Sequence, residues 1–245
     1  MVTALITGAA HGLGACMAEH AARRGYRVGV LDLDLDASRA IAEPIGGVAL
    51  AADVTDPGQV EAAVERLGDT PGFLINNAGI LRVGPLLEQS VEDFCRVTDV
   101  NLNSVFIVSQ IVARRMKDNG GGAIVNLASI NAIHPSMSCG AYAAAKAGIV
   151  CLTQQMSLEW GEYGIRVNSI APGFIDAGMS APFFENPAIR ELRGNAVPLG
   201  RLGSADDVAE CAMFLASEAA AYITGQNIAI DGGVINSVLK QLPRE

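Results

Sequence analysis

The chain has 245 residues, of which 50% are hydrophobic, and it carries a net charge of −9 at pH 7 with a mean hydropathy of +0.32. This composition supplies a large apolar core, and it argues against a disordered chain and against a basic surface for nucleic acid. The five cysteines include no CxxC pair, no apolar run approaches the about 18 residues of a membrane span, and no basic leader precedes an apolar core at the start. We therefore expect a cytoplasmic protein with free thiols and with no metal, membrane or nucleic-acid partner.

The first predicted element is the strand Thr3–Thr7, which leads into a glycine turn, residues 8–14 (GAAHGLG), and a helix from Ala15 to about Arg24. In this arrangement backbone N–H groups and the helix N-terminus bind a pyrophosphate, which glycines allow to approach closely. Taken alone the pattern is weak, because tight turns without a ligand look the same.

A second predicted strand, Arg27–Leu31, ends at Asp32. A dinucleotide-binding fold presents an acid at this position to the ribose hydroxyls. The same carboxylate would repel a 2′-phosphate, since charges about 4 Å apart interact by roughly 4 kcal/mol at an effective dielectric constant of about 20. Asp32 therefore predicts NAD rather than NADP, whereas Asp34 and Asp36 are interpreted as solvated residues entering the next helix.

Strands and helices alternate along the rest of the chain. Further strands are predicted at Val48–Ala52, Phe73–Ile75, Ala123–Leu127, Ile165–Ile170 and Asn227–Ile230, and helices at Gln59–Leu67, Glu92–Lys117, Tyr142–Trp160 and Ala205–Ser217. The alternation predicts one α/β domain over residues 1–245, a doubly wound, mainly parallel sheet with helices on both faces. Residues 174–196 are predicted to be a long irregular connection that forms a substrate lid. The tail, residues 234–245, either reaches a neighbouring subunit's pocket or is a frayed end.

Several asparagines stand where an amide needs partners. Asn76 and Asn77 follow the strand Phe73–Ile75, where they either pin the central strands or contact a cofactor. Asn101 and Asn103 interrupt a helix that is apolar nearly all round. Such a helix is buried on more than one side, and a partner subunit is the simplest cover.

Tyr142 precedes Lys146 by four residues, and Ser129 follows an apolar strand. If Tyr142 opens a helix, the tyrosine and the lysine share one face. A phenol titrates near about 10, and a lysine and an oxidised nicotinamide ring beside it would favour the phenolate. A shift of roughly three units, about 4 kcal/mol, would make Tyr142 a general base, with Ser129 holding the substrate oxygen. The pattern thus indicates hydride transfer from an alcohol.

In order and spacing these motifs resemble the short-chain dehydrogenase/reductase family in its single-domain, Rossmann-like form. The resemblance runs from the first strand to the last turn and is carried by TGxxxGxG (Thr7, Gly8, Gly12 and Gly14), Asp53-Val54, Asn76-Asn77-Ala78-Gly79, Ser129, YxxxK (Tyr142 and Lys146), Pro172-Gly173 and Asp231-Gly232-Gly233.

The resemblance implies a role for each matching residue. Tyr142 would be the general acid/base, Lys146 would bind the nicotinamide ribose and lower the tyrosine pKa, and Ser129 would bind the substrate oxygen. Asn101, with Asn103 as the alternative, would hold a water that relays protons toward Lys146. The cofactor-binding residues that it implies are Gly8, His11, Gly12, Leu13, Gly14, Asp32, Asp53, Val54, Asn77, Ala78, Gly79, Tyr142, Lys146, Pro172, Gly173 and Ile175.

Within that set Asp53 and Val54 are expected at the adenine, Asn77 near the adenosine ribose, and the Ile175 backbone at the carboxamide. Ala177 stands where the family commonly has a threonine that contacts the carboxamide, so that contact is either lost or supplied by Ser180. The family's usual homotetramer, or a homodimer, agrees with the apolar helix.

The sequence leaves three functions to compare. The first is an NAD-dependent dehydrogenase of a secondary alcohol, such as a polyol, a sugar or a small hydroxy compound. The second is a 3-oxoacyl-thioester reductase of the acyl-carrier-protein type, which Asp32 disfavours because reductive biosynthesis usually runs on NADPH. The third is a catalytically idle dinucleotide-binding regulator, which the complete set of Asn101, Ser129, Tyr142 and Lys146 disfavours.

Substrate contacts are expected from the segment after Ser129 and from the lid. The candidates are Asn131, His134, Met179, Arg190 and Arg193. Asn131 and His134 would bind hydroxyl groups, although His134 equally fits a loop cap. Arg190 and Arg193 would clamp a carboxylate, sulfonate or phosphate, although arginines on a helix are more often solvated.

Overall fold

The computed structural model describes residues 2–237, which form an α/β fold around one seven-stranded sheet. All strands are parallel, and their order across the sheet is β3 (Val48–Ala51), β2 (Arg27–Asp32), β1 (Thr3–Thr7), β4 (Pro71–Asn76), β5 (Gly122–Leu127), β6 (Ile165–Pro172) and β7 (Asn227–Ile230). The chain moves outward in one direction from β1 to β3 and in the other from β4 to β7. The crevice above such a reversal is where open α/β sheets bind ligands.

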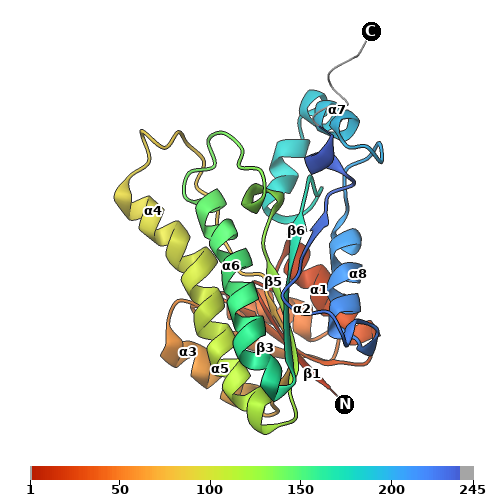
Figure 1. Cartoon of the computed structure of the whole chain (residues 1–245). Helices are drawn as coiled ribbons and strands as arrows, with labels where there is room; N and C mark the ends of the chain where they lie inside the picture. Colours follow the sequence, from red (N-terminus) through yellow and green to blue (C-terminus); the bar gives the residue numbers. More distant parts are fainter. Residues whose placement is uncertain (1, 238–245) are drawn as a thin grey trace.

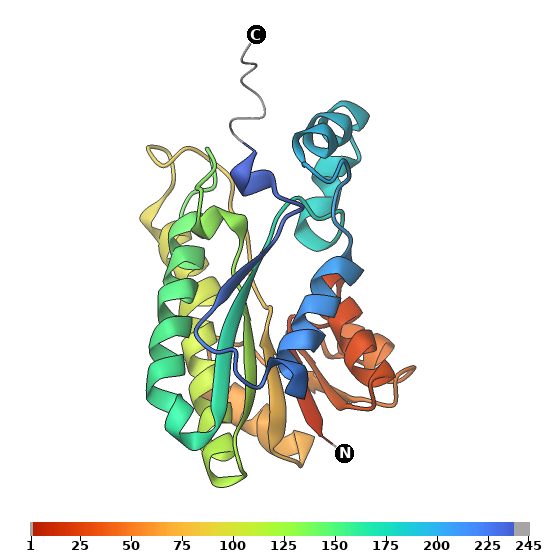
Figure 2. The same ribbon diagram turned by 45° about the vertical axis from the view of Figure 1, so that its right-hand side comes forward.

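Helices cover both faces of the sheet, as Figures 1 and 2 show. One layer consists of α1 (Gly12–Arg23), α2 (Leu35–Ala42) and α8 (Ala205–Ala216), and the other of α3 (Pro57–Leu67), α5 (Ser104–Asp118) and α6 (Tyr142–Trp160). Each layer packs on its own apolar cluster, because buried parallel strands present hydrophobic side chains to both faces. The predicted doubly wound α/β fold is confirmed. No helix within residues 2–237 has the length and apolarity to cross a membrane.

The prediction of one continuous helix over residues 92–117 is wrong in the middle of that range. The structure has α4 (Val91–Thr98) and α5, separated by a π-helical turn, Asp99–Asn103. Inside that turn the Asn101 amide donates to the carbonyl oxygens of Val97 and Ile80, at 2.8 and 2.9 Å. The turn therefore ties this helix to the loop that follows β4, and isolated π turns often occur at functional sites.

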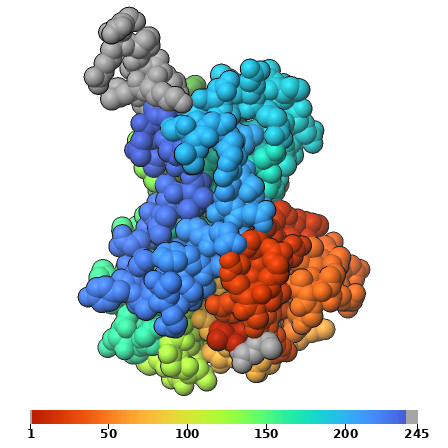
Figure 3. Space-filling model, turned by 90° about the vertical axis from the view of Figure 1, so that its right-hand side faces the viewer, coloured from red at the N-terminus to blue at the C-terminus, as the bar shows by residue number. Residues whose placement is uncertain are grey.

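The prediction of an irregular connection over 174–196 also needs correction. Ile175 pairs with Gly203, a 3-10 turn spans Gly178–Phe184, and α7 spans Pro187–Ala196. Asn186 caps α7 by accepting the Ala188 N–H, and proline fits the first turn because it needs no N–H there. In Figure 3 this segment, in cyan, stands as a lobe above the N-terminal part of the molecule. That this segment is a substrate lid stays a prediction.

A buried chain of polar side chains fastens the central strands to the helices. Asn76 donates to Ser109 Oγ and to Asn126 Oδ1, both at 2.8 Å, and Asn126 donates to Thr153 Oγ1 at 2.9 Å. All four residues are buried. Asn76 therefore has the pinning role that was one of its two predicted roles.

We expect Asn126→Ala to destabilise the protein by about 2–3 kcal/mol, because it leaves buried groups of Asn76 and Thr153 without partners. For a chain of this size that corresponds to a melting temperature lower by roughly 5–10 °C. Thermal unfolding followed by circular dichroism measures the change, and Asn195→Ala, on an exposed position of α7, is the control. Equal melting temperatures for the two variants would contradict the proposed importance of the buried chain.

The predicted tail falls partly outside the described residues. Val234–Asn236 form a 3-10 turn after β7, and Val234 and Ile235 line the cavity described below. Residues 238–245, with which the tail would reach a neighbouring pocket or fray, lie outside the described part of the chain.

Candidate active site

A cavity of about 920 Å³ lies at the carboxyl ends of the strands, beside the point where the strand order reverses. Its wall includes most of the predicted cofactor residues and three of the four predicted catalytic residues, all but Asn101. These wall residues are Gly8, His11, Gly12, Leu13, Asp32, Asp53, Val54, Asn77, Ala78, Gly79, Ser129, Tyr142, Lys146, Pro172, Gly173 and Ile175.

The glycine turn forms one side of this cavity and has no room for side chains. Gly8 and Gly12 have φ values of +61° and +54°, which side-chain-bearing residues rarely adopt. A Cβ on Gly8 would lie 2.8 Å from Ala78 Cα, and one on Gly12 would lie 2.6 Å from Gly178 Cα. Gly14 does not line the cavity; its missing side chain lets α1 pack against Gly8 and Ala9. The turn and the N-terminus of α1 thus form a bare backbone surface that suits a pyrophosphate.

Thr7 and Asn77 hold that turn against the end of β4. Asn77 Nδ2 donates to the carbonyl oxygens of Thr7 and Gly8 at 3.0 and 2.9 Å. In return Thr7 Oγ1 accepts the backbone N–H groups of Asn77 and Ala78. The Asn77 amide donors therefore position the glycine turn. Asn77 also lines the cavity, at the end where the adenosine is expected.

Asp32 and Asp53 mark one end of the cavity. The Asp32 carboxylate accepts the Leu33 N–H at 2.8 Å and the Ala10 N–H at 3.1 Å, which fixes its orientation. Asp53 Oδ1 accepts both the hydroxyl and the N–H of Thr55, and these hydrogen bonds hold the pKa of Asp53 below its usual value. The two acids belong to the predicted adenosine end.

Ser129, Tyr142 and Lys146 meet at the other end. Tyr142 begins α6, and one turn later the Lys146 Nζ lies 5.5 Å from the centre of the phenol ring. Lys146 Nζ donates to the carbonyl oxygen of Leu127 at 2.5 Å, and Ser129 Oγ accepts the Asn131 N–H at 3.1 Å. The predicted juxtaposition of serine, tyrosine and lysine is present.

In the protein alone, the pKa of the Tyr142 phenol is raised, whereas the sequence led us to expect a lowered pKa. Burial raises the pKa of Tyr142 to about 12, against a smaller lowering by the Ser129 hydroxyl. Burial also lowers the pKa of Lys146 to about 8. Desolvation disfavours both charged forms, so a depressed tyrosine pKa needs a further positive charge in the cavity.

Asn101 is fully buried beneath the site rather than exposed on its wall. Its amide donates to two carbonyl oxygens, as described above, and its Oδ1 accepts the Ile80 N–H at 3.2 Å. Gly79 lies so close that a Cβ there would be 2.6 Å from the same oxygen. The side chain is thus occupied with backbone contacts, so the predicted water would have to be held by the main chain of the π-helical turn. The alternative, Asn103, is exposed and donates to Asp99 instead.

Around Ile175 the backbone alternates as in a strand. Phe174 O and Asp176 N both bond to Gly203, so the N–H and C=O of Ile175 point away from it. That geometry agrees with the predicted backbone contact of Ile175. Ala177 and Ser180 both line the cavity. Both predicted outcomes for the carboxamide contact therefore stay open, its loss at Ala177 or its supply by Ser180.

The predicted substrate residues divide into two groups. Asn131, His134, Met179 and Arg193 line the cavity, and Asn131 Oδ1 accepts hydrogen bonds from the N–H and hydroxyl of Ser136. Arg190 does not line it; its guanidinium bonds to Asp176 and to the Phe184 carbonyl beside a smaller second pocket. The pairing of Arg190 with Arg193 in one anion clamp is therefore not what the structure presents.

Some wall residues were not identified from the sequence. Arg96 of α4 lies 3.8 Å from Asp53, and Phe174 covers the end near Ile175. Ser138 has a φ of +61°, uncommon for a residue with a side chain, and Cys139 follows it on the cavity wall. The sequence contained one signal for these wall residues, which is that Phe174 directly follows the Pro172-Gly173 turn.

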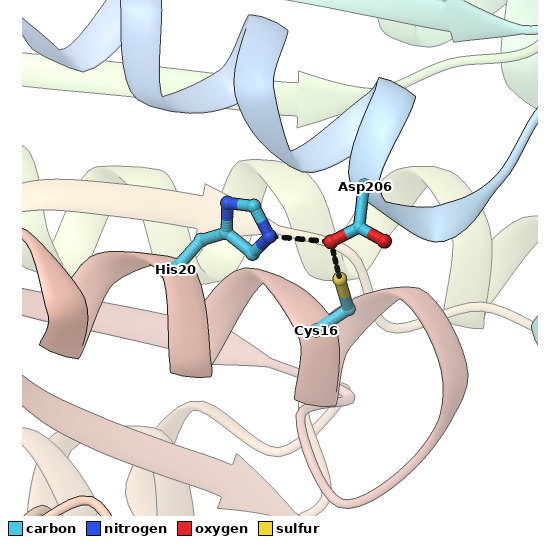
Figure 4. Close-up of side chains that lie close together, drawn as sticks. All are labelled: Cys16, His20 and Asp206. Carbon is cyan, nitrogen blue, oxygen red and sulfur yellow. Dashed lines mark hydrogen bonds and ion pairs between the residues drawn. The ribbon is translucent and has the colours of Figure 1, made fainter.

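Side chains of the kinds that bind metals also gather outside the cavity, between α1 and α8 (Figure 4). His20 Nε2 lies 2.7 Å from Asp206 Oδ1, Cys16 Sγ lies 3.7 Å from the same oxygen, and His20 Nδ1 lies 3.0 Å from Glu210 Oε1. Burial, together with Asp206, raises the pKa of the Cys16 thiol to about 11. Both ring nitrogens of His20 thus have partners, Asp206 at Nε2 and both Glu210 and Arg24 at Nδ1, and we interpret this cluster as a link between the two helices.

Comparison with known proteins agrees with this geometry. A family profile described as enoyl-(acyl carrier protein) reductase matches residues 8–235. A sorbitol dehydrogenase of Cereibacter sphaeroides is 40% identical, over 94% of this chain and 96% of that protein. Among solved structures, a short-chain type dehydrogenase/reductase from Mycobacterium marinum has a TM-score of 0.88 at 35% identity, with 95% of each chain covered. A gluconate 5-dehydrogenase from Burkholderia cenocepacia J2315, in complex with NADP and tartrate, has a TM-score of 0.91 at 31% identity, covering 97% of this chain and 96% of that one. The glycine turn, the serine–tyrosine–lysine group and these likenesses together show that the chain belongs to the short-chain dehydrogenase/reductase family of oxidoreductases.

Proposed function

We propose that the protein is an NAD-dependent dehydrogenase of a secondary alcohol, with a polyol, a sugar or a small hydroxy compound as substrate. The observation that carries the proposal is the layout of one cavity, with Asp32 at one end and Ser129, Tyr142 and Lys146 at the other. An acid that binds ribose hydroxyls and a phenol that exchanges a proton with an alcohol are the two requirements of this reaction.

The residues present fit a nicotinamide dinucleotide. The bare glycine turn would hold the pyrophosphate, Asp32 the adenosine ribose, and Lys146 the nicotinamide ribose. When bound, the cofactor supplies the acceptor or donor of hydride. Ser129 holds the substrate oxygen by a hydrogen bond, and Tyr142 Oη takes the hydroxyl proton during oxidation or returns it during reduction. Asn101 shapes the π-helical turn whose main chain would hold a proton-relaying water beside Lys146.

The positive charge of an oxidised nicotinamide would reverse the effect of burial on Tyr142. We expect the near-ultraviolet absorbance of tyrosinate, taken as wild type minus Tyr142→Phe, to show no ionisation of Tyr142 below about pH 10 in the free protein. Added NAD⁺ should move this ionisation to lower pH, whereas NADH, which lacks the ring charge, should move it much less. Identical titrations with NAD⁺ and NADH would remove the ring charge from the mechanism.

The proposed activity is tested by initial rates with NAD⁺ and NADP⁺ on a panel of polyols, sugars and simple secondary alcohols. The second candidate, a 3-oxoacyl-thioester reductase, is favoured by the likeness to a 3-oxoacyl-[acyl-carrier-protein] reductase of Escherichia coli, which is 36% identical over 94% of this chain and 96% of that protein. Acetoacetyl-CoA with NADPH and with NADH therefore belongs in the same panel. Faster turnover of the thioester with NADPH than of any alcohol with NAD⁺ would replace the first proposal by the second.

We further propose that the protein works as a homotetramer or homodimer in the cytoplasm. Large apolar side chains are exposed on the helices α4, α5 and α6, with Val91, Phe94, Phe106 and Leu158 between 41% and 83% exposed. A second subunit would cover them. Light scattering after size-exclusion chromatography measures the subunit number, and a monomer would contradict the proposal.

All five cysteines are unpaired, as in a reducing compartment. This agrees with the proposed location in the cytoplasm.

A further inference from the structure

The guanidinium of Arg193 is held at the cavity wall by aromatic rings. Its Cζ lies 5.2 Å from the ring centre of Phe174, 5.7 Å from that of Phe183 and 5.6 Å from that of Phe184. In cation–π contacts of this kind the cation lies over the faces of the rings. The N–H donors lie at the edge of the guanidinium, where they can meet a ligand.

Arg193 also differs from its neighbour Arg190 in its charge partners. One turn earlier on α7, Arg190 forms an ion pair with Asp176. Within residues 2–237 no carboxylate lies within ion-pair distance of Arg193. Arg193 is partly buried and lines the cavity with no carboxylate at ion-pair distance, so its N–H donors are available to an anionic ligand there.

The carboxylates of the cavity wall are confined to one end, where Arg96 lies 3.8 Å from Asp53. Among the described wall residues the carboxylates are Asp32 and Asp53, both at the adenosine end. The opposite end contains Arg193, Lys146 and His134. Phe174, which Arg193 contacts, directly follows the Pro172-Gly173 turn. A chain with a net charge of −9 thus keeps its negative groups away from the place where the substrate would sit.

We propose that Arg193 binds the carboxylate of the substrate, so that the preferred substrate is a polyhydroxy acid rather than a neutral polyol. The inference rests on the proposed dehydrogenase function and narrows its substrate class. The planar fork of arginine matches a carboxylate with two parallel hydrogen bonds. Ser129, Ser136 and His134 line the same end and supply polar groups for the hydroxyls.

The test compares acids with their matched neutral alcohols. D-Gluconate and D-sorbitol, and D-threonate and D-threitol, differ only in a terminal carboxylate or hydroxymethyl group. With wild type and NAD⁺ we expect a higher kcat/KM for at least one acid than for its alcohol. Arg193→Met keeps an apolar stem on the phenylalanine rings, and it should lower kcat/KM for that acid about 30- to 100-fold while changing the matched alcohol and the KM for NAD⁺ less than about threefold. Arg193→Lys should retain part of the activity on the acid, and Arg66→Met, at an exposed position of α3, should match wild type.

Other results separate this inference from the proposed function. Better use of the alcohol in every pair, an equal loss on acid and alcohol in Arg193→Met, or a rise confined to the KM for NAD⁺ would each overturn the role of Arg193. If no alcohol at all is oxidised, the dehydrogenase proposal fails, and calorimetry with tartrate and the protein–NADH complex decides the anion site. Tartrate binding that Arg193→Met abolishes and Arg66→Met retains supports it, and tartrate binding unchanged in Arg193→Met overturns it.

Discussion

Replacing Tyr142 by phenylalanine should lower kcat for alcohol oxidation by about 10³-fold or more, while the affinity for NADH changes little. The substitution removes one oxygen atom, the proposed proton acceptor, and a positioned general base contributes about 10²- to 10⁴-fold. The ring stays in place at the start of α6, so neither the fold nor the contact with Lys146 is lost. Steady-state rates and NADH fluorescence titration measure the two quantities.

Tyr222→Phe is the matched control, because Tyr222 is fully exposed and does not line the cavity. It should keep the rates of the parent protein. If Tyr142→Phe kept them too, Tyr142 would not be the base, and the arrangement of Ser129, Tyr142 and Lys146 would have no chemical role.

Replacing Asp32 by asparagine should shift cofactor preference toward NADP by about 30- to 150-fold, expressed as the ratio of kcat/KM with NAD⁺ to that with NADP⁺. Asparagine keeps an oxygen for one of the backbone N–H groups that Asp32 accepts, from Ala10 and Leu33. What it removes is the negative charge that repels a 2′-phosphate and binds the ribose hydroxyls. The repulsion between two such charges about 4 Å apart is roughly 4 kcal/mol. Asp32 is half-buried, so solvent screens this repulsion to about 2–3 kcal/mol.

The control for this charge is Asp36→Asn, on an exposed residue of α2 that pairs with Arg39 and does not line the cavity. It should leave the ratio unchanged. An unchanged ratio in Asp32→Asn would show that the adenosine ribose does not lie against Asp32.

The strands were predictable because each is a short apolar run that ends in a turn signal. Val28, Val30 and Leu31, for example, are buried in β2, as expected for a strand covered on both faces. The π-helical turn was not predictable, because one extra residue in a helix leaves the apolar pattern almost unchanged. Helix α7 was missed because Pro182, Pro187 and Gly194 suggested irregular backbone, although Asn186 and Pro187 together are a helix start.

In the site, residue identities were predictable but side-chain partners were not. The motifs located Asn77 and Asn101, yet only the fold reveals that their amide donors are used by backbone carbonyl groups. Likewise Arg190 and Arg193 look equivalent in sequence, one turn apart on the same helix. The position of Asp176, brought beside Arg190 by the pairing of Ile175 with Gly203, is a tertiary fact that makes them different.

The link between α1 and α8 has a mechanical consequence. His20 is bonded to Asp206 and lies beside Glu210, so the helix that starts at the phosphate turn and the helix that starts just after Gly203 are braced as one frame. Gly203 also pairs with Ile175, so both ends of the segment between these two residues are attached to the linked helices α1 and α8. We therefore expect any movement of this lobe during turnover to be confined to the residues between Ile175 and Gly203, while the glycine turn keeps its shape.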